Sequence, residues 1–110
     1  MKRKSKKNNG TAYEHHVAQK MKWLGWFYVR QIGKSGDFGA DITAYNFFMS
    51  KIVVQCKNYK GKVGVHAIQE VIAARQYYKA ERAAVATNST FTRQAKQLAK
   101  KCNVELWERF

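Results

Sequence analysis

Apolar residues recur at a helical spacing in the N-terminal part of the chain. They lie three or four residues apart, at Tyr13, Val17, Met21 and Leu24. This spacing places the four side chains on one face of a helix. Thr11 and Glu14 form a capping-box pattern that predicts the start of this helix, and Gly25 predicts its end.

Strand and helix patterns alternate through the rest of the chain. Strands are predicted where β-branched and aromatic residues gather, at residues 26–31, 40–46, 51–58, 83–87 and 104–107. Helices are predicted where the helical spacing returns, at residues 65–79 and from a cap at Thr90 or Thr92 to about residue 101. Loops are predicted at residues 32–38 and at the hairpin turn, 47–51.

The predicted elements follow one another in the order α-β-β-β-α-β-α-β. Strands joined by a hairpin run antiparallel, whereas the strands of a β-α-β unit run parallel. The sequence therefore predicts an α/β fold in which a mixed β-sheet is flanked by helices. The chain contains no proline and shows no repeat or internal linker.

Positive charge is spread over the whole chain. Its 21 lysines and arginines oppose 7 acidic residues, which gives a net charge of +14. Residues 1–9 hold five of these cations and no acid, so the rest of the chain still carries +9. We predict a basic flexible tail over residues 1–10 and a single folded domain over residues 11–110. A charge of this size attracts polyanions, so DNA is the expected partner; a generic basic protein is the weaker alternative.

Other function classes find little support in the sequence. No run of about 18 apolar residues is present, and no apolar stretch follows the basic start, so neither a transmembrane helix nor a signal peptide is expected. No window resembles a basic amphipathic helix with a bulky apolar face, so a membrane partner is not expected. Cys56 and Cys102 form no Cys-x-x-Cys pattern, which predicts neither zinc nor a disulfide. The expected setting is the cytoplasm.

Three polar residues interrupt the predicted hairpin strands. Gln55 and Lys57 are two positions apart, so their side chains share one face of a strand. A hairpin centred near Met49 would place Asp41 opposite Lys57 and Thr43 opposite Gln55. An acid, an amide and a lysine would then converge at one end of the sheet.

Such a group fits the hydrolysis of a phosphodiester. Asp41 can hold Mg²⁺, which prefers oxygen ligands, and the amide oxygen of Gln55 and the main-chain carbonyl of Cys56 can add to its coordination. Lys57 can orient the attacking water, help to deprotonate it, or stabilise charge on the phosphate. An Asp followed later by Gln-x-Lys also occurs by chance, so these residues alone would favour a turn Asp and a surface Lys.

Six segments, two of which contain these three residues, strengthen the interpretation. They are Tyr13-Glu14-His15-His16-Val17-Ala18, Gly36-Asp37-Phe38-Gly39-Ala40-Asp41, Val53-Val54-Gln55-Cys56-Lys57-Asn58-Tyr59, Val63-Gly64-Val65, Ile68-Gln69-Glu70 and Ala86-Thr87-Asn88-Ser89-Thr90-Phe91-Thr92. With these segments in this order, residues 11–107 resemble the Mrr-type catalytic domain of restriction endonucleases, a branch of the PD-(D/E)xK nuclease superfamily. The resemblance implies a restriction-endonuclease-like fold and a DNA endonuclease that uses Mg²⁺ or Mn²⁺.

The resemblance also assigns roles to single residues. It maps the metal-binding acid to Asp41, the second acid position to Gln55, as is common in the Mrr branch, and the catalytic lysine to Lys57. Glu14 would supply a further metal-binding carboxylate from the first helix, or else serve only the capping box. Gln69 matches a helix glutamine of the family that approaches the site, or else it is a solvated polar residue.

Several cations lie where they could contact DNA phosphates. They are Lys60, Lys62, Arg93, Lys96 and Lys100. Two other functions stay open: a DNA-binding module that has lost efficient cleavage, and a structure-selective nuclease of the Holliday-junction type, against which Gln55 argues. Larger Mrr-like proteins carry a separate recognition domain, and none is visible in this sequence. A separate specificity partner is therefore considered, and so is a homodimer, because a double-strand cut needs two active sites.

Overall fold

The structure is a computed structural model that describes residues 2–32 and 38–110. Its elements are α1 (Lys2–Trp23), β1 (Phe27–Gln31), β2 (Ile42–Tyr45), β3 (Lys51–Lys57), α2 (Val65–Tyr77), β4 (Arg82–Thr87), α3 (Arg93–Cys102) and β5 (Glu105–Trp107). This order confirms the predicted α-β-β-β-α-β-α-β arrangement. The loop predicted at 32–38 lies for the most part outside the described residues.

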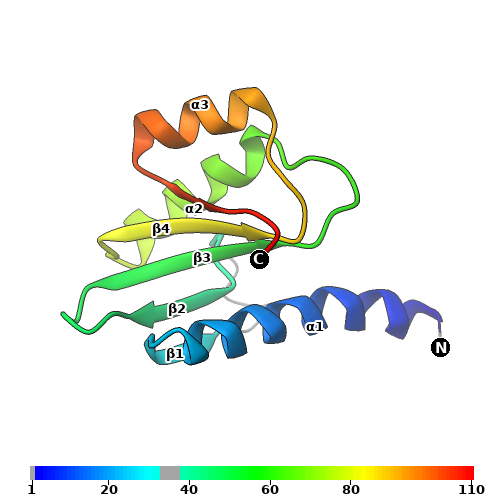
Figure 1. The fold of residues 1–110 in the computed structure, drawn as a ribbon, viewed down its shortest axis with the longest axis horizontal. Helices are drawn as coiled ribbons and strands as arrows, with labels where there is room; N and C mark the ends of the chain where they lie inside the picture. Colours follow the sequence, from blue (N-terminus) through cyan, green and yellow to red (C-terminus); the bar gives the residue numbers. More distant parts are fainter. Residues whose placement is uncertain (1, 33–37) are drawn as a thin grey trace.

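The described strands form one mixed sheet in the order β1-β2-β3-β4-β5 (Figure 1). The β1–β2 and β2–β3 pairs are antiparallel, whereas β3–β4 and β4–β5 are parallel. The mixed sheet predicted from the hairpin and the β-α-β units is thereby confirmed. Because β3 and β4 run parallel, their carboxyl ends lie at the same edge of the sheet, and polar side chains placed there can meet.

The hairpin register differs from the predicted one by two residues. The observed pairs are Ile42 with Val54, Thr43 with Val53, Ala44 with Ile52 and Tyr45 with Lys51. The predictions that Asp41 lies opposite Lys57 and Thr43 opposite Gln55 are therefore wrong. Asp41 lies just before the paired residues of β2, and its main-chain N–H donates to the carbonyl of Val54. Because the shift is an even number of residues, every side chain keeps its predicted face.

The turn between β2 and β3 explains the shift. The side-chain oxygen of Asn46 accepts hydrogen bonds from the main-chain N–H groups of Phe48, at 2.9 Å, and Ser50, at 2.8 Å. The N–H of Asn46 also donates to the carbonyl of Ser50. These bonds close a turn that is centred on Phe48 instead of Met49. A single asparagine side chain thus sets the register of the hairpin.

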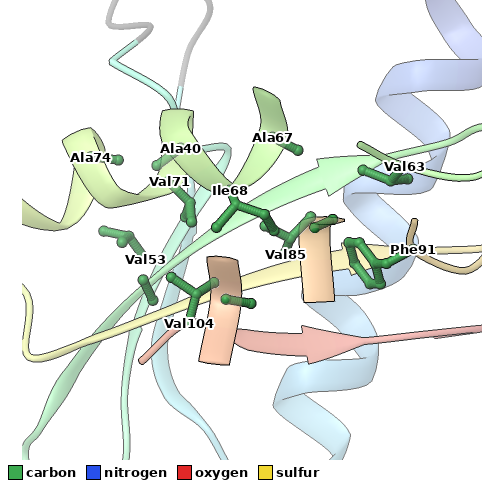
Figure 2. Packing of buried hydrophobic residues seen from close by; sticks show 13 residues of the cluster. Ala40, Val53, Val63, Ala67, Ile68, Val71, Ala74, Val85, Phe91 and Val104 are labelled. Atoms are coloured by element: carbon green, nitrogen blue, oxygen red, sulfur yellow. The ribbon is translucent and has the colours of Figure 1, made fainter. Parts of the chain in front are cut away.

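The sheet is covered by helices on both faces (Figure 1). On one face α1 packs against the sheet, through a cluster that includes Val17, Met21, Ile42, Ile52, Val54 and Ala84. On the other face α2 and α3 pack against β3 and β4, through a cluster that includes Val53, Ile68, Val71, Val85, Phe91 and Ala95. Figure 2 shows Ile68 reaching from α2 toward Val85 of β4. Burial of these two apolar layers fixes α1 and α2 on opposite sides of β3.

The first helix begins earlier than predicted. The α1 helix spans Lys2–Trp23, so Thr11 lies inside it and is not its N-cap. The capping-box prediction for Thr11 and Glu14 is therefore wrong. The residues before Thr11 include lysine and arginine, which favour helix, and no proline that would stop it. The flexibility of residues 1–10 in solution stays a prediction.

The predicted helix end and the predicted cap of α3 agree with the structure. Gly25 has a φ of +100°. The N–H of Trp26 donates to the carbonyl of Met21, which completes a Schellman motif. At α3, Thr92 is the N-cap, and its side chain accepts a hydrogen bond from the N–H of Ala95. Across residues 2–32 and 38–110, no helix is long and apolar enough to cross a membrane.

Candidate active site

Gln55 and Lys57 lie at the carboxyl end of β3 and face α2. Val53, on the same face of the strand, belongs to the core beneath α2. Val54 and Cys56 point the other way and pack in the cluster beneath α1. The prediction that Gln55 and Lys57 share a face is thereby confirmed. Gln55 is only 7% exposed, so its amide requires partners within the protein.

Asp41 is held against the same end of β3. Its main-chain N–H donates to the carbonyl of Val54 at 2.8 Å, which ties the residue before β2 to β3. Its carboxylate oxygen Oδ2 then accepts a hydrogen bond from the main-chain N–H of Cys56 at 2.7 Å. The carboxylate is therefore fixed beside the strand that carries Gln55 and Lys57. Asp41 thus lies beside the end of β3 that carries Gln55 and Lys57, although it is not opposite Lys57 as predicted.

A third side chain, Glu70 of α2, contacts both polar residues of β3. The Nε2 of Gln55 donates to Oε1 of Glu70 at 2.9 Å. The Nζ of Lys57 lies 3.3 Å from the same oxygen. The other carboxylate oxygen, Oε2, lies 3.4 Å from Nε2 of His66, one helical turn earlier. Glu70 is thus the residue of this site that the sequence reasoning missed, while the neighbouring Gln69 is exposed.

A signal for Glu70 was present in the helical pattern. Ala67, Val71 and Ala74 mark the side of α2 that is buried against the sheet. Glu70 lies three residues after Ala67 and four before Ala74, and residues at this spacing lie on one side of a helix. An acid at the margin of a sheet-facing stripe points toward the strands. Gln69 lies outside that stripe, which is why it does not face Gln55.

A glycine sets the distance between α2 and the segment that carries Asp41. Gly39 has a φ of +84°. A Cβ at this position would collide with the main-chain carbonyl of Glu70. The chain before Asp41 can therefore pass α2 at close range only because residue 39 has no side chain. This contact places the main chain of Glu70 directly against Gly39, two residues before Asp41.

The opposite face of β3 brings Glu14 toward the site. Burial raises the pKa of the Cys56 thiol, and the negative charges of Asp41 and Glu14 raise it further, while Lys57 lowers it. The thiol therefore feels both carboxylates, one from the segment before β2 and one from α1. A thiol with a raised pKa stays protonated at neutral pH and is a poor metal ligand.

Comparison with known proteins decides the family. The family model described as Restriction endonuclease, Mrr_cat, matches residues 5–109. The chain belongs to this Mrr-type restriction endonuclease family. The resemblance found in the sequence is thereby confirmed. Among curated proteins, no sequence matches this Mrr-type domain.

Solved structures share the fold of this Mrr-type domain. The DNA modification-dependent restriction endonuclease AspBHI has a TM-score of 0.72 and 19% identity, with 97% of this chain and 30% of AspBHI covered. The MspJI restriction endonuclease in complex with a 27-mer oligonucleotide has a TM-score of 0.64 and 15% identity, with 94% of this chain and 27% of MspJI covered. A repair endonuclease from Pyrococcus abyssi has a TM-score of 0.63 and 18% identity, with 89% of this chain and 46% of the repair endonuclease covered. The Mrr-type chain thus spans less than half the length of each of these three proteins.

The donors at this site fit a divalent metal that prefers oxygen. Within residues 2–32 and 38–110, no group of three or more His, Cys, Asp or Glu residues could hold a metal ion. A metal at this Mrr-type site would therefore need amide or main-chain oxygens beside its carboxylates. Asp41, Gln55 and the carbonyl of Cys56 offer such oxygens. Hard oxygen donors suit Mg²⁺ or Mn²⁺ and do not suit zinc.

Hydrogen bonds from Thr87, the last residue of β4, and from Asn88 hold the chain where β3 ends and the next loop begins. Asn88 accepts from the N–H of Tyr59 at 2.8 Å and donates to the carbonyl of Tyr59 at 3.0 Å. The Thr87 hydroxyl donates to the carbonyl of Lys57 at 2.7 Å. In this Mrr-type domain, the Thr-Asn pair at the end of β4 therefore fixes the backbone on both sides of Asn58.

The predicted DNA-contact cations fall into two groups. Lys60 and Lys62 are exposed on the loop after β3, and Arg93 opens α3 just beyond the residues that follow β4, so all three lie at the site end of the sheet. Lys96 is exposed, and its Nζ lies 3.9 Å from Glu108. Lys100 lies in the last turn of α3, about 10 Å along the helix axis from Arg93 and away from the site.

Proposed function

We propose that this domain is a metal-dependent DNA endonuclease that hydrolyses phosphodiester bonds. The observation that carries the proposal is the Asp41 carboxylate bonded to the backbone of β3 at Cys56, between Gln55 and Lys57, within a chain of net charge +14. The basic surface would attract the DNA backbone, and the polar group would act on one of its phosphates. Membership of the Mrr-type family supports both parts of the proposal.

Each residue of the group has a distinct task in this proposal. Asp41 and Gln55 would offer oxygens to the metal, together with the main-chain carbonyl of Cys56, and Glu14 would add a carboxylate from α1. A bound Mg²⁺ or Mn²⁺ would neutralise charge on the scissile phosphate and lower the pKa of a bound water. Lys57 would donate hydrogen bonds to the attacking water or to the phosphate as negative charge develops.

DNA is the proposed substrate, and the target sequence would be chosen outside this domain. The solved MspJI structure holds an oligonucleotide, and AspBHI is described as DNA modification-dependent. Because the chain spans less than half of these proteins, we assign it the cleavage step alone and propose that a separate partner supplies specificity. A homodimer would bring two sites to the two strands of a duplex.

Cleavage of a supercoiled plasmid tests the proposal. We expect nicked or linear product with Mg²⁺ or Mn²⁺, and none with EDTA. The Asp41→Ala and Lys57→Ala proteins should each lose more than about 100-fold in rate, because each change removes a group that touches the reacting phosphate or its metal. A matched control is Glu81→Gln, which removes a carboxylate that bonds to the main chain of Lys51 at the opposite end of β3.

The products also distinguish the alternatives. Linear DNA that appears without prior accumulation of nicked circles would support a dimer, whereas nicked circles alone would indicate single sites acting on one strand. A domain that shifts DNA on a gel equally in wild-type and variant form, and cuts it in neither, would be a DNA-binding module that has lost cleavage.

A further inference from the structure

Gln55 poses an orientation problem that a carboxylate at the same position would not have. The two oxygens of a carboxylate are equivalent, so either can face a cation. An amide has one oxygen and one NH₂ group, and a rotation by 180° exchanges an acceptor for a donor. Only one of the two orientations of Gln55 can therefore serve as a ligand for a cation.

The contact with Glu70 selects that orientation. An ionised carboxylate only accepts hydrogen bonds, so the group of Gln55 that faces Glu70 must be the NH₂. The structure has this arrangement, with Nε2 of Gln55 2.9 Å from Oε1 of Glu70. The amide is planar, so its oxygen is turned away from Glu70. Because Gln55 is only 7% exposed, water does not compete freely for the NH₂ group, and the contact persists.

Glu70 itself is held in place through both its main chain and its carboxylate. Its main-chain carbonyl abuts Gly39. Its Oε2 faces His66 and its Oε1 faces Lys57, at 3.4 Å and 3.3 Å. The Glu70 side chain is 33% exposed. It can therefore impose an orientation on Gln55 without a large loss of its own conformational freedom.

We propose that Glu70 is a positioning residue that makes an amide usable at the second metal-ligand position. It fixes Gln55 so that the amide oxygen is offered to the metal, and it places beside Gln55 the negative charge that the amide lacks. The inference rests on the proposed function, because it concerns the metal of that same site. It adds a residue on α2 to a site otherwise built from the hairpin and α1.

Direct Mn²⁺ binding gives a readout that does not depend on cleavage. The side-chain NH₂ signals of Gln55 in an ¹⁵N-correlated NMR spectrum report its contact with Glu70, and Mn²⁺ broadens signals near its site. In Glu70→Ala, the NH₂ signals should move toward those of a solvated amide. The Mn²⁺ concentration for half-maximal broadening should rise about 10- to 100-fold, the usual effect of losing a partner that orients a ligand. Glu70→Gln keeps an acceptor, so it should show a smaller rise, and Glu81→Gln should show none.

A double-mutant cycle separates orientation from a merely structural role. In a Gln55→Glu background, the ligand no longer has a wrong orientation, and Glu70 becomes a like charge beside it. In that background, the effect of Glu70→Gln on the Mn²⁺ concentration for half-maximal broadening should therefore vanish or reverse. The same fold-change in both backgrounds would overturn the inference, and so would a Glu70→Ala protein with wild-type Mn²⁺ binding.

Cleavage assays keep this inference distinct from the proposed function. The inference is supported if Glu70→Ala needs a higher Mn²⁺ concentration to reach half its maximal cleavage rate while its KM for DNA is unchanged. Wild-type protein that cleaves DNA with metal while Glu70→Ala shows the same metal dependence would overturn the positioning role and leave the nuclease proposal standing. Wild-type protein that neither cleaves DNA nor binds Mn²⁺ near Gln55 would overturn both.

Discussion

Single residues in this site are tuned by neighbours that are distant in the sequence. Cys56 is adjacent to Gln55 and Lys57 in the chain, yet its thiol responds to burial beneath α1 and to the charges of Asp41 and Glu14. Because its pKa is raised, the thiol carries a proton at neutral pH. Cys56 would therefore contribute its main-chain oxygen to the site, and its side chain acts as a small apolar group in the core.

This raised pKa predicts slow alkylation of Cys56. In a Cys102→Ser protein with EDTA present, iodoacetamide at pH 8 should modify folded Cys56 at least about tenfold more slowly than the urea-unfolded chain, since each pKa unit reduces the thiolate tenfold. Mass spectrometry of samples quenched over time measures both rates. Equal rates would show that the thiol is neither buried nor surrounded by carboxylates as described.

The residues of the site differ in how far the sequence could reveal them. Gln55 and Lys57 follow from the alternation of side chains along one strand, which is a local rule. Asp41 follows from its place before the neighbouring strand. Glu70 depends on how α2 packs on the sheet, and its neighbour Gln69 was the more obvious candidate from the family pattern. Packing over 15 residues of sequence separation, from Gln55 to Glu70, decided between them.

At the scale of elements, the order of helices and strands was predictable because apolar spacing changes clearly between the two. The register of the hairpin was not, because Asn46 sets the turn through two side-chain hydrogen bonds. The start of α1 was also missed, since Thr11 has the character of a cap but the helix continues past it to Lys2. Side-chain bonds and tertiary context override local propensity at such points.

The contact between Gly39 and α2 gives a prediction at this scale. Gly39→Ala should destabilise the domain by about 2 kcal/mol or more, because the new methyl collides with the main chain of Glu70 at a residue that also has a positive φ. Gly25→Ala is the matched control, since its φ is +100° but a Cβ there meets nothing within 4 Å. It should cost only about 1 kcal/mol.

Urea denaturation followed by circular dichroism measures both changes. The difference between the two variants isolates the collision from the cost of the positive φ. If Gly39→Ala were no less stable than Gly25→Ala, α2 would not approach the segment before Asp41 as closely as the structure shows. Metal-dependent cleavage should fall in Gly39→Ala as well, because the collision displaces Glu70 from Gln55.

At the scale of the whole molecule, we expect DNA to bind at one edge of the sheet. The carboxyl ends of β3 and β4, the loop with Lys60 and Lys62, and the start of α3 lie at that edge. The N-terminus of α1 lies toward the same end of the molecule (Figure 1). Its first nine residues carry five cations and no acid. We therefore expect this segment to add to DNA affinity without contributing to the chemistry.

Deletion of residues 1–10 tests that expectation. The truncated chain loses five cations and keeps a net charge of +9. The slope of log Kd against log salt concentration should become shallower by up to about four. Each contact between a cation and a phosphate adds close to one to the magnitude of this slope. The cleavage rate at saturating DNA should stay within about twofold of the wild type. An unchanged slope, measured by fluorescence anisotropy, would show that the segment makes no phosphate contacts.

The role proposed for Asp41 and Lys57 is to act on a DNA phosphate with a divalent metal. Its most direct test is the single-turnover cleavage rate at saturating protein, with DNA binding measured in the same samples. We expect Asp41→Ala and Lys57→Ala to bind DNA nearly as tightly as the wild type with Mg²⁺ or Mn²⁺, yet to cleave it more than about 100-fold more slowly. Equal cleavage rates in the three proteins, or wild-type cleavage that persists in EDTA, would contradict it.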